Sequence, residues 1–302
     1  MTRPDILSSR RARWIAATVA AIIVIVVGIL VARALRTLGP VSSFIADHPG
    51  VLEPLAGTPA GLPVWLAWQH YLNAFFLVLI VKTGWQVRTT RRPPAYWARR
   101  GSRGSGTKIS VTLWLHLALD VLWVLNGVVF LILIFATGHW ARIVPTSWEI
   151  VPNAVSVFLQ YASLDWPTEN GWIAYNALQV LSYFGVVFIL APLAIVTGLR
   201  MSPLWPSSAA RLSRAYPIEV ARAVHFPTML AFVAFVVVHV TLVAATGLLR
   251  NLNHMYAVRD DASWWGLLVF VIGTAVMVAA WFLAGPTITR TLAALTGSVT
   301  RN

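Results

Sequence analysis

The chain has 302 residues, of which 58% are hydrophobic and 11% charged, and its mean hydropathy is +0.73. This composition excludes an ordinary soluble protein and predicts a polytopic protein of the lipid bilayer. The net charge of +13 does not predict nucleic-acid binding, because the basic residues lie in short loops beside apolar segments. The absence of cysteine excludes iron–sulfur ligation and covalent haem attachment through a CxxCH motif.

Six segments are long and apolar enough to cross a bilayer. They are residues 14–35, 63–86, 110–137, 173–199, a central helix within 219–253, and 264–283. Lys and Arg cluster before the first segment, after the second, after the fourth and after the sixth, so the positive-inside rule places these regions in the cytoplasm. The predicted fold class is all-α, a polytopic transmembrane bundle of about six spans with cytoplasmic N- and C-termini.

We expect a single membrane domain over residues 1–302. Residues 1–62 form an extra N-terminal span and outer loop, 63–256 the functional core, and 257–302 the final span and tail. The basic loop 88–108 contains Gly, Ser and Pro and is predicted to be flexible and to contact anionic lipid. The outer loop 138–172 is predicted to contain an interfacial helix within 148–166, which is the candidate surface for an outer partner.

Two histidines, His225 and His239, lie inside the central apolar stretch. They are 14 residues apart, so one helix would separate them by roughly 21 Å along its axis and by only about 40° around it. An imidazole in hydrocarbon is unfavourable unless it has a partner. Two imidazoles on one face, near opposite membrane surfaces, suit two stacked metal centres, and haem is the natural candidate.

Two further histidines have matching depths, since His70 lies near the outer end of its span and His116 near the inner end of the next. Depth pairs His70 with His239 (the outer couple) and His116 with His225 (the inner couple), each supplying two axial nitrogens to a low-spin, non-covalent b-type haem. An iron with both axial positions filled exchanges electrons rather than binding substrate. Each histidine by itself could instead be a hydrogen-bonded residue between helices, but the agreement of four in depth favours two haems.

Three charged residues are candidates to support these centres. Arg222 precedes His225 by three residues and Arg250 lies at the outer end, so either could bind haem propionates, or could simply extend to the membrane surface. Asp120 follows His116 by one helical turn, and a carboxylate there costs on the order of 3 kcal/mol on insertion scales. We expect Asp120 to orient His116 or His225 by accepting an Nδ1 proton, or to pass protons to a quinone.

The second and fifth spans contain motifs of a known family. The second reads His70-Tyr71-Leu72-Asn73-Ala74 with Thr83-Gly84 near its end, and the fifth reads Arg222-Ala223-Val224-His225 followed by His239. With His116 on the third span, these motifs resemble the di-haem cytochrome b subunits that anchor nickel-iron hydrogenases, formate dehydrogenases and related molybdopterin oxidoreductases. The extra N-terminal span departs from many relatives and leaves the side of any quinone site open.

The resemblance implies a multi-pass subunit of the cytoplasmic (inner) membrane of a prokaryote, with two haems b and a quinone, menaquinone or ubiquinone. Two phrases, residues 190–199 and 250–254, look most similar to forms that accompany an exported molybdopterin oxidoreductase, which implies such a catalytic subunit on the outer side. The leading hypothesis is an electron-transfer subunit without catalytic residues of its own. A stand-alone transmembrane haem reductase, and a haem-free transporter or structural membrane subunit, are the alternatives.

Overall fold

The computed structural model describes residues 10–100, 108–166, 170–206, 208 and 210–301. Within this part of the chain, six helical segments are long and apolar enough to cross a membrane, which confirms the polytopic helical bundle. They are α1 (Arg10–Arg36), α3 (Val64–Thr89), α4 (Val111–Ala136), the continuous segment Ala177–Met201, α9 (Ile218–Ala245) and α11 (Trp265–Leu283). Only 6–11% of the apolar window of each span is buried, as expected where lipid takes the place of a core.

The chain divides into two compact units, each described here by itself. The first comprises Met1–Ala56 and Ala141–Tyr183, and contains α1, α2 (Gly39–Asp47) and α5 (Ile150–Ala162). Helix α5 lies within the segment where we expected an interfacial helix. The C-terminal end of α1 is tied to the end of α5, because Arg33 Nε donates to the Ser163 carbonyl at 2.9 Å and Arg36 Nη1 to Ser163 Oγ at 2.6 Å.

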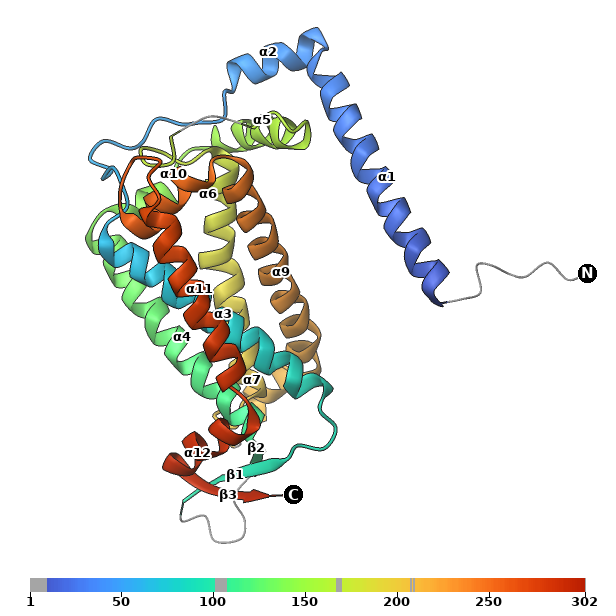
Figure 1. Cartoon of the computed structure of the whole chain (residues 1–302), viewed down its shortest axis with the longest axis vertical. Helices are drawn as coiled ribbons and strands as arrows, with labels where there is room; N and C mark the ends of the chain where they lie inside the picture. Colours follow the sequence, from blue (N-terminus) through green and yellow to red (C-terminus); the bar gives the residue numbers. More distant parts are fainter. Residues whose placement is uncertain (1–9, 101–107, 167–169, 207, 209, 302) are drawn as a thin grey trace, which may run out of the picture. The chain divides into compact units, whose positions relative to one another are not determined.

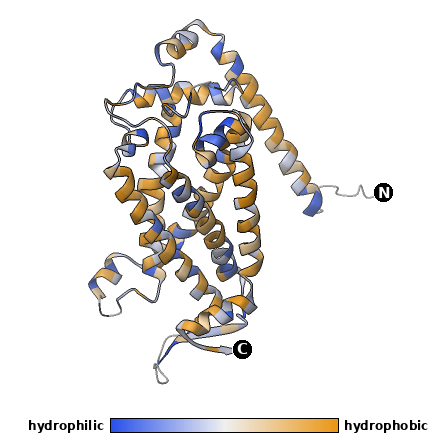
Figure 2. Cartoon of the chain, turned by 60° about the vertical axis from the view of Figure 1, so that its left-hand side comes forward, coloured by the Kyte–Doolittle hydropathy of each residue, from blue (hydrophilic) through white to orange (hydrophobic). Residues whose placement is uncertain are grey.

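The second unit comprises Gly57–Trp140 and Phe184–Asn302 and contains all four histidines of the two couples. Helices α3 and α4 pack along each other, as do α9 and α7 (Ala191–Met201). The α7 helix follows α6 (Ala177–Phe184) and a π-helical stretch, η3 (Gly185–Leu190). Figure 1 shows these helices running side by side, and Figure 2 shows hydrophobic residues along most of their length.

The outer end of this unit is closed by short elements between α9 and α11. They are α10 (Leu248–Leu252) and the π-helix η4 (Asn253–Ala257), which packs against both α11 and α3. Asn253 is fully buried and anchors the turn, since its side-chain nitrogen donates to the Ser263 carbonyl at 2.9 Å and its oxygen accepts from the Gly266 amide at 2.6 Å. The last turn of this loop is thus fixed beside the first turn of α11.

A small sheet at the inner end was not expected from the sequence. Strand β1 (Ala95–Arg99) lies between β2 (Ile109–Ser110) and β3 (Gly297–Arg301), and both pairings are antiparallel. Part of the basic loop that we expected to be flexible is therefore a strand paired with the end of the chain, while residues 101–107 lie outside the described residues. The strand pairs residues about two hundred positions apart, from Ala95 with Arg301 to Arg99 with Gly297, and such a distant partner is invisible to local sequence patterns.

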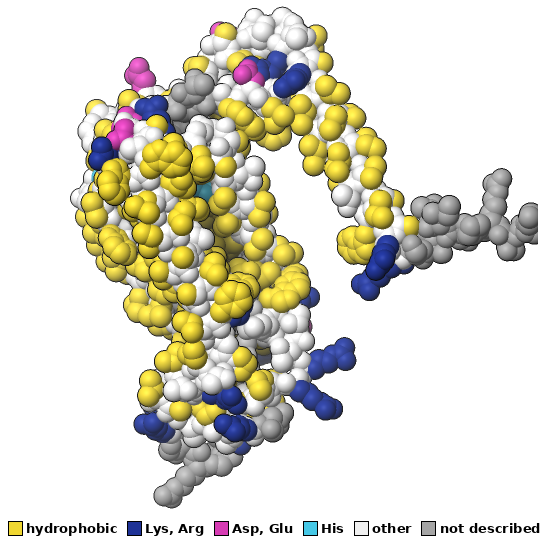
Figure 3. Space-filling model, viewed as in Figure 1, with side chains coloured by type: hydrophobic (Ala, Val, Ile, Leu, Met, Phe, Trp, Pro, Cys, Tyr) yellow, Lys and Arg dark blue, Asp and Glu magenta, His cyan; other side chains and the backbone are white. Residues whose placement is uncertain are grey.

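The sheet and the amphipathic helix α12 (Pro286–Thr296) share a small apolar core. Ala95, Val111 and Ala293 are buried there, with Trp97 and Trp114 packed against them. In Figure 3, Lys and Arg side chains gather at this end of the second unit, below the apolar surface of the helices. The basic residues therefore mark the end that the positive-inside rule assigns to the cytoplasm.

Candidate functional site

The outer couple is formed by α3 and α9, whose chain directions are opposed. His70 is near the start of α3 and His239 is near the end of α9, so both imidazoles reach the same level. Their ring centroids are 6.2 Å apart, with an interplanar angle of 56°. Metal–nitrogen bonds to imidazole are about 2.0 Å and a ring centre lies about 1 Å behind its nitrogen, so two axial imidazoles need about 6 Å between centres. The spacing fits two axial ligands on one iron.

Aromatic rings surround the outer couple. Phe235 lies nearly parallel to His239, with 5.6 Å between centroids and an interplanar angle of 10°. Tyr256 of η4 meets His70 edge-on at 5.8 Å, and its hydroxyl lies 3.5 Å from His70 Nδ1, at the limit of hydrogen bonding. Burial, with a smaller effect of Tyr71, raises the pKa of Tyr256 to about 12, so this hydroxyl keeps its proton at any physiological pH.

The inner couple is held by hydrogen bonds from two neighbouring helices. Thr83 Oγ1 of α3 lies 3.0 Å from His116 Nδ1 on α4, and Thr197 Oγ1 of α7 lies 2.8 Å from His225 Nδ1 on α9. The two helix pairs meet at this level, because Trp85, next to Gly84 on α3, and Phe226, next to His225 on α9, have ring centroids 6.3 Å apart. Four helices thus converge at this level, each supplying either an imidazole or the hydroxyl that positions it.

The threonine protons decide which histidine nitrogen carries hydrogen. Thr83 Oγ1 donates to the Leu79 carbonyl at 2.8 Å, and Thr197 Oγ1 donates to the Leu193 carbonyl at 2.6 Å. A hydroxyl has only one proton to donate, so toward the histidine each threonine must accept. Each Nδ1 therefore carries the proton and each Nε2 keeps its lone pair, which is the tautomer that an axial ligand of haem iron requires.

A glycine follows each threonine and lets the imidazole approach the helix backbone. A Cβ at Gly84 would stand 3.1 Å from His116 Cε1, and one at Gly198 would stand 3.4 Å from His225 Cε1. The first distance is tighter than ordinary carbon contacts and the second is at their lower edge. The two Thr-Gly pairs therefore form matching seats for the inner imidazoles, on two different helices.

The charged candidates take different positions. Asp120 Oδ2 lies 3.7 Å from His116 Nε2, beyond hydrogen-bond range, and threonines occupy the Nδ1 positions that we expected Asp120 to serve. Arg222 is exposed on α9, one turn before His225. Arg250 is engaged by Asp260, at 3.0 Å from Nε and 2.8 Å from Nη2. Binding of propionates by either arginine, and proton transfer by Asp120, stay predictions.

From the sequence, Thr83-Gly84 was part of a family motif and Thr197-Gly198 part of the phrase at residues 190–199, and neither pair was given a role. Thr-Gly also stands at residues 137–138, 246–247 and 296–297, so the dipeptide alone is no signal. What sets residues 83–84 and 197–198 apart is their place inside two spanning helices, near the inner ends. Thr83 and Thr197 are also almost completely buried, at 0% and 1% exposure. A repeated polar residue in two apolar spans is a stronger hint of a shared partner than either occurrence alone.

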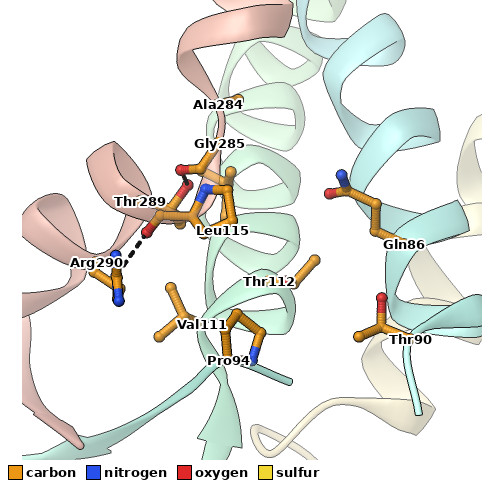
Figure 4. A pocket seen from close by; sticks show the side chains of 11 residues that line it. Gln86, Thr90, Pro94, Val111, Thr112, Leu115, Ala284, Gly285, Thr289 and Arg290 are labelled. Carbon is orange, nitrogen blue, oxygen red and sulfur yellow. Dashed lines mark hydrogen bonds between the residues drawn. The ribbon is translucent and has the colours of Figure 1, made fainter. Parts of the chain in front are cut away.

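A pocket of about 240 Å³ lies at the inner end, close to the inner couple. Figure 4 shows Gln86 of α3 and Thr90 just after it on one side, with Val111, Thr112 and Leu115 of α4 facing them. On the far side lie Thr289 and Arg290 of α12 and the two residues that precede this helix, Ala284 and Gly285. Thr112 is four residues before His116, so the two share a face of α4. Gln86 is three residues after Thr83, so residues that line the pocket lie one turn from residues of the inner couple on both α3 and α4.

These features define a membrane-spanning helical protein whose histidines are placed to hold haem. Residues 61–258 match the family described as prokaryotic cytochrome b561, and the chain belongs to that family. It is accordingly a multi-pass membrane cytochrome that binds haem b and transfers electrons.

A curated relative is the putative protein-methionine-sulfoxide reductase subunit YedZ1 of Azospira oryzae. It is 30% identical over 189 residues, which cover 60% of this chain and 89% of the relative. No solved structure matches the chain.

Proposed function

We propose that this cytochrome carries electrons through two haems b, one on the outer couple and one on the inner couple, between an oxidoreductase partner and the quinone pool. The observation that supports the proposal is the arrangement of four imidazoles from three helices at two levels. The outer couple has the 6.2 Å ring spacing of two axial ligands, and the inner couple has both Nδ1 atoms engaged by hydroxyls.

The haems supply reversible one-electron chemistry, and the protein supplies position and a dry medium. The two histidines of α9 set the levels of the centres roughly 21 Å apart along that helix. A haem held by two histidines would have no open position for oxygen or substrate, so it would serve electron transfer alone. A relay of this kind divides the low-dielectric interior of the bilayer into two short steps.

The pocket beside the inner couple is our candidate quinone site. Oxidation of a quinol there would release two electrons, which bound haems would take up one at a time, and two protons, which would leave to the inner side of the membrane. The Gln86 amide and the Thr112 hydroxyl line the pocket and can donate hydrogen bonds to the ring oxygens of menaquinone or ubiquinone. Asp120, on the same face of α4 as His116, is a candidate to receive a proton.

The partner that we propose is the catalytic subunit of an oxidoreductase on the outer side of a prokaryotic inner membrane. The name of the YedZ1 relative, a putative protein-methionine-sulfoxide reductase subunit, supports an assembly with a reductase. The motifs at residues 190–199 and 250–254 favour a molybdopterin-dependent enzyme of the sulfite-oxidase type over a hydrogenase or a formate dehydrogenase. A stand-alone haem reductase is the alternative, and it differs in needing no second subunit.

Purification in mild detergent tests for the proposed oxidoreductase partner, and titration with quinol tests for electron transfer from quinone to the haems. We expect a cofactor-bearing subunit to co-purify, and we expect added quinol to reduce the haems on the millisecond-to-second scale. Gln86→Leu and Thr112→Val should slow this reduction while chemical reduction by dithionite stays complete. Thr89→Val is the matched control, because Thr89 lies on the same turn region of α3 but outside the pocket lining.

Two outcomes contradict these proposals. A native protein whose haems are reduced by dithionite but never by quinol would remove the quinone from the scheme. A homogeneous preparation that is fully active with an external donor and carries no second subunit would favour the stand-alone reductase.

A further inference from the structure

The two couples differ in how their imidazoles are held, and the difference is concentrated in the Thr-Gly pairs. At the inner couple both Nδ1 atoms meet threonine hydroxyls, at 3.0 Å for His116 and 2.8 Å for His225. At the outer couple the hydroxyl nearest to His70 Nδ1 belongs to Tyr256 and is 3.5 Å away. The inner hydrogen bonds are therefore shorter, and they come from residues that are themselves fixed to a helix backbone.

Each threonine oxygen acts as an acceptor because its hydroxyl is already hydrogen-bonded to the helix backbone. The hydroxyl proton is committed to the helix carbonyl four residues earlier, which turns a lone pair of Oγ1 toward the imidazole. With the hydroxyl proton on the carbonyl, the other imidazole tautomer would place a buried Nδ1 lone pair against an oxygen lone pair. In an apolar interior such a mismatch is strongly unfavourable.

An acceptor on Nδ1–H makes the opposite nitrogen a stronger donor to a metal. Hydrogen bonds from ligating imidazoles to neighbouring acceptors orient the ring and raise the basicity of the ligand. A more electron-rich ligand stabilises the oxidised iron and so lowers the reduction potential of the centre. The effect acts twice at the inner couple, because both of its imidazoles are held in the same way.

Resting on the proposed bis-histidine haems, we propose that Thr83-Gly84 and Thr197-Gly198 are a duplicated positioning device that fixes both axial imidazoles of the inner haem in the Nδ1–H form and lowers that haem's reduction potential. The glycines bring each ring against the backbone, and the threonines set its rotation and its electron donation. None of the four residues is required to touch the haem. They act through His116 and His225.

The test is a spectroscopic redox titration of the whole purified protein carrying Thr83→Val or Thr197→Val. Valine keeps the branched shape of threonine and removes the hydroxyl acceptor, while the Ile80 backbone beside His116 stays. We expect the outer component to keep its midpoint potential and the inner component to become easier to reduce. The expected change is on the order of tenfold in the reduction equilibrium for each variant, which is about 59 mV for a one-electron couple. The double variant should shift further than either single variant.

Two further variants distinguish an effect of the hydroxyl on the histidine from a general effect on helix structure. Thr83→Ser retains the hydroxyl and should restore the native potential. Thr89→Val removes a hydroxyl that makes the same helix hydrogen bond, 2.8 Å to the Trp85 carbonyl, without contacting a histidine, and should leave both potentials unchanged. Loss of the inner haem in Thr83→Val, with retention of that haem at its native potential in Thr83→Ser, also supports the device.

Unchanged inner potential in both valine variants, with haem retained, would overturn the inference and leave the proposed function intact. Equal shifts in Thr83→Val and Thr83→Ser would overturn it as well, because the hydroxyl would then be irrelevant. A native protein that purifies without haem would instead contradict the proposed function itself. The two failures are therefore distinguished by the haem content of the native chain.

Discussion

The inner and outer couples use the same residue type but achieve order by different means. The inner imidazoles are held by hydroxyls whose own protons are bound to helix carbonyls, so their rotation is fixed by directional bonds. The outer imidazoles lie among aromatic rings, with Phe235 stacked on His239 and Tyr256 edge-on to His70. Directional bonds define a tautomer, whereas ring packing defines mainly a plane.

Two haem sites with the same ligands need not have the same reduction potential. A haem whose imidazoles meet threonine hydroxyls at 3.0 Å and 2.8 Å and a haem whose His70 meets a tyrosine hydroxyl at 3.5 Å should differ in electron donation even if the iron ligands are identical. The helices supply the reason, because α3 and α7 each carry a Thr-Gly pair one to two turns before their inner ends, while the outer side is closed by the loop that contains η4. Variants can therefore be aimed at one couple without touching the other.

The largest effect should come from removing an axial ligand. His239→Ala is expected to remove the outer haem, leave the inner haem and abolish electron flow across the membrane, since one relay is missing. His116→Ala is expected to do the converse. Haem content and low-temperature absorption spectra measure both outcomes. Simultaneous loss of both haems in either variant would indicate misfolding, and unchanged haem content would rule out the axial role.

A smaller effect should follow from filling the two glycine seats. Gly84→Ala places a carbon 3.1 Å from His116 Cε1, and overpacking of this kind typically costs about 1–3 kcal/mol, so inner-haem affinity should fall roughly tenfold. Gly198→Ala places its carbon at 3.4 Å and should have a clearly weaker effect. Haem retention during detergent dialysis compares them. Equal losses in the two variants, or loss of the outer haem first, would contradict the described geometry.

The smallest effect concerns the outer loop and its pH dependence. Hydrogen bonds from Ser263, then the one from Arg259, lower the pKa of Asp261 to about 2, below the ordinary value of about 3.9. Because the folded pKa is depressed, the stabilisation is complete above about pH 4 and is lost as pH falls toward 2. Hydrogen exchange of the 258–264 amides should therefore be unchanged from pH 5 to 8, after correction for intrinsic rates, and should accelerate below pH 4.

The matched control for this pH effect is Asp261→Asn. At pH 6 the 258–264 amides of this variant should exchange faster than those of the native protein, and the additional acceleration below pH 4 should be lost. An acid response that persists in Asp261→Asn would assign the effect to another group. The response should also leave the inner couple unaffected, because the loop lies at the opposite end of the bundle.

Much of the fold followed from composition and hydrophobic length. The six spans were found because each is a long apolar run, and the depths of His70, His116, His225 and His239 followed from their positions within those runs. The sheet of β1, β2 and β3 could not be predicted, since its central pairing joins residues that are far apart in the chain and lie in polar loops. Local patterns carry no information about such a partner.

The positions of the histidines along the helices could be predicted from the sequence. The residues that hydrogen-bond to the histidines could not. Spacing on one helix is fixed by helical geometry, so two histidines of α9 could be placed on one face. Which neighbour meets Nδ1 depends on how α3 and α7 rotate about their own axes, and that rotation is set by packing between helices. Asp120 was the obvious polar neighbour in sequence, yet Thr83 and Thr197 are the residues that make the contacts.

The central claim is that the chain holds two haems b, each between two histidines. The most direct test is the haem-to-polypeptide ratio of the purified native protein, with electron paramagnetic resonance of the oxidised form. The account predicts a ratio of two and two low-spin ferric signals, of which one disappears in His225→Ala and the other in His239→Ala. A ratio of one or zero, or a high-spin signal from the native protein, would contradict it.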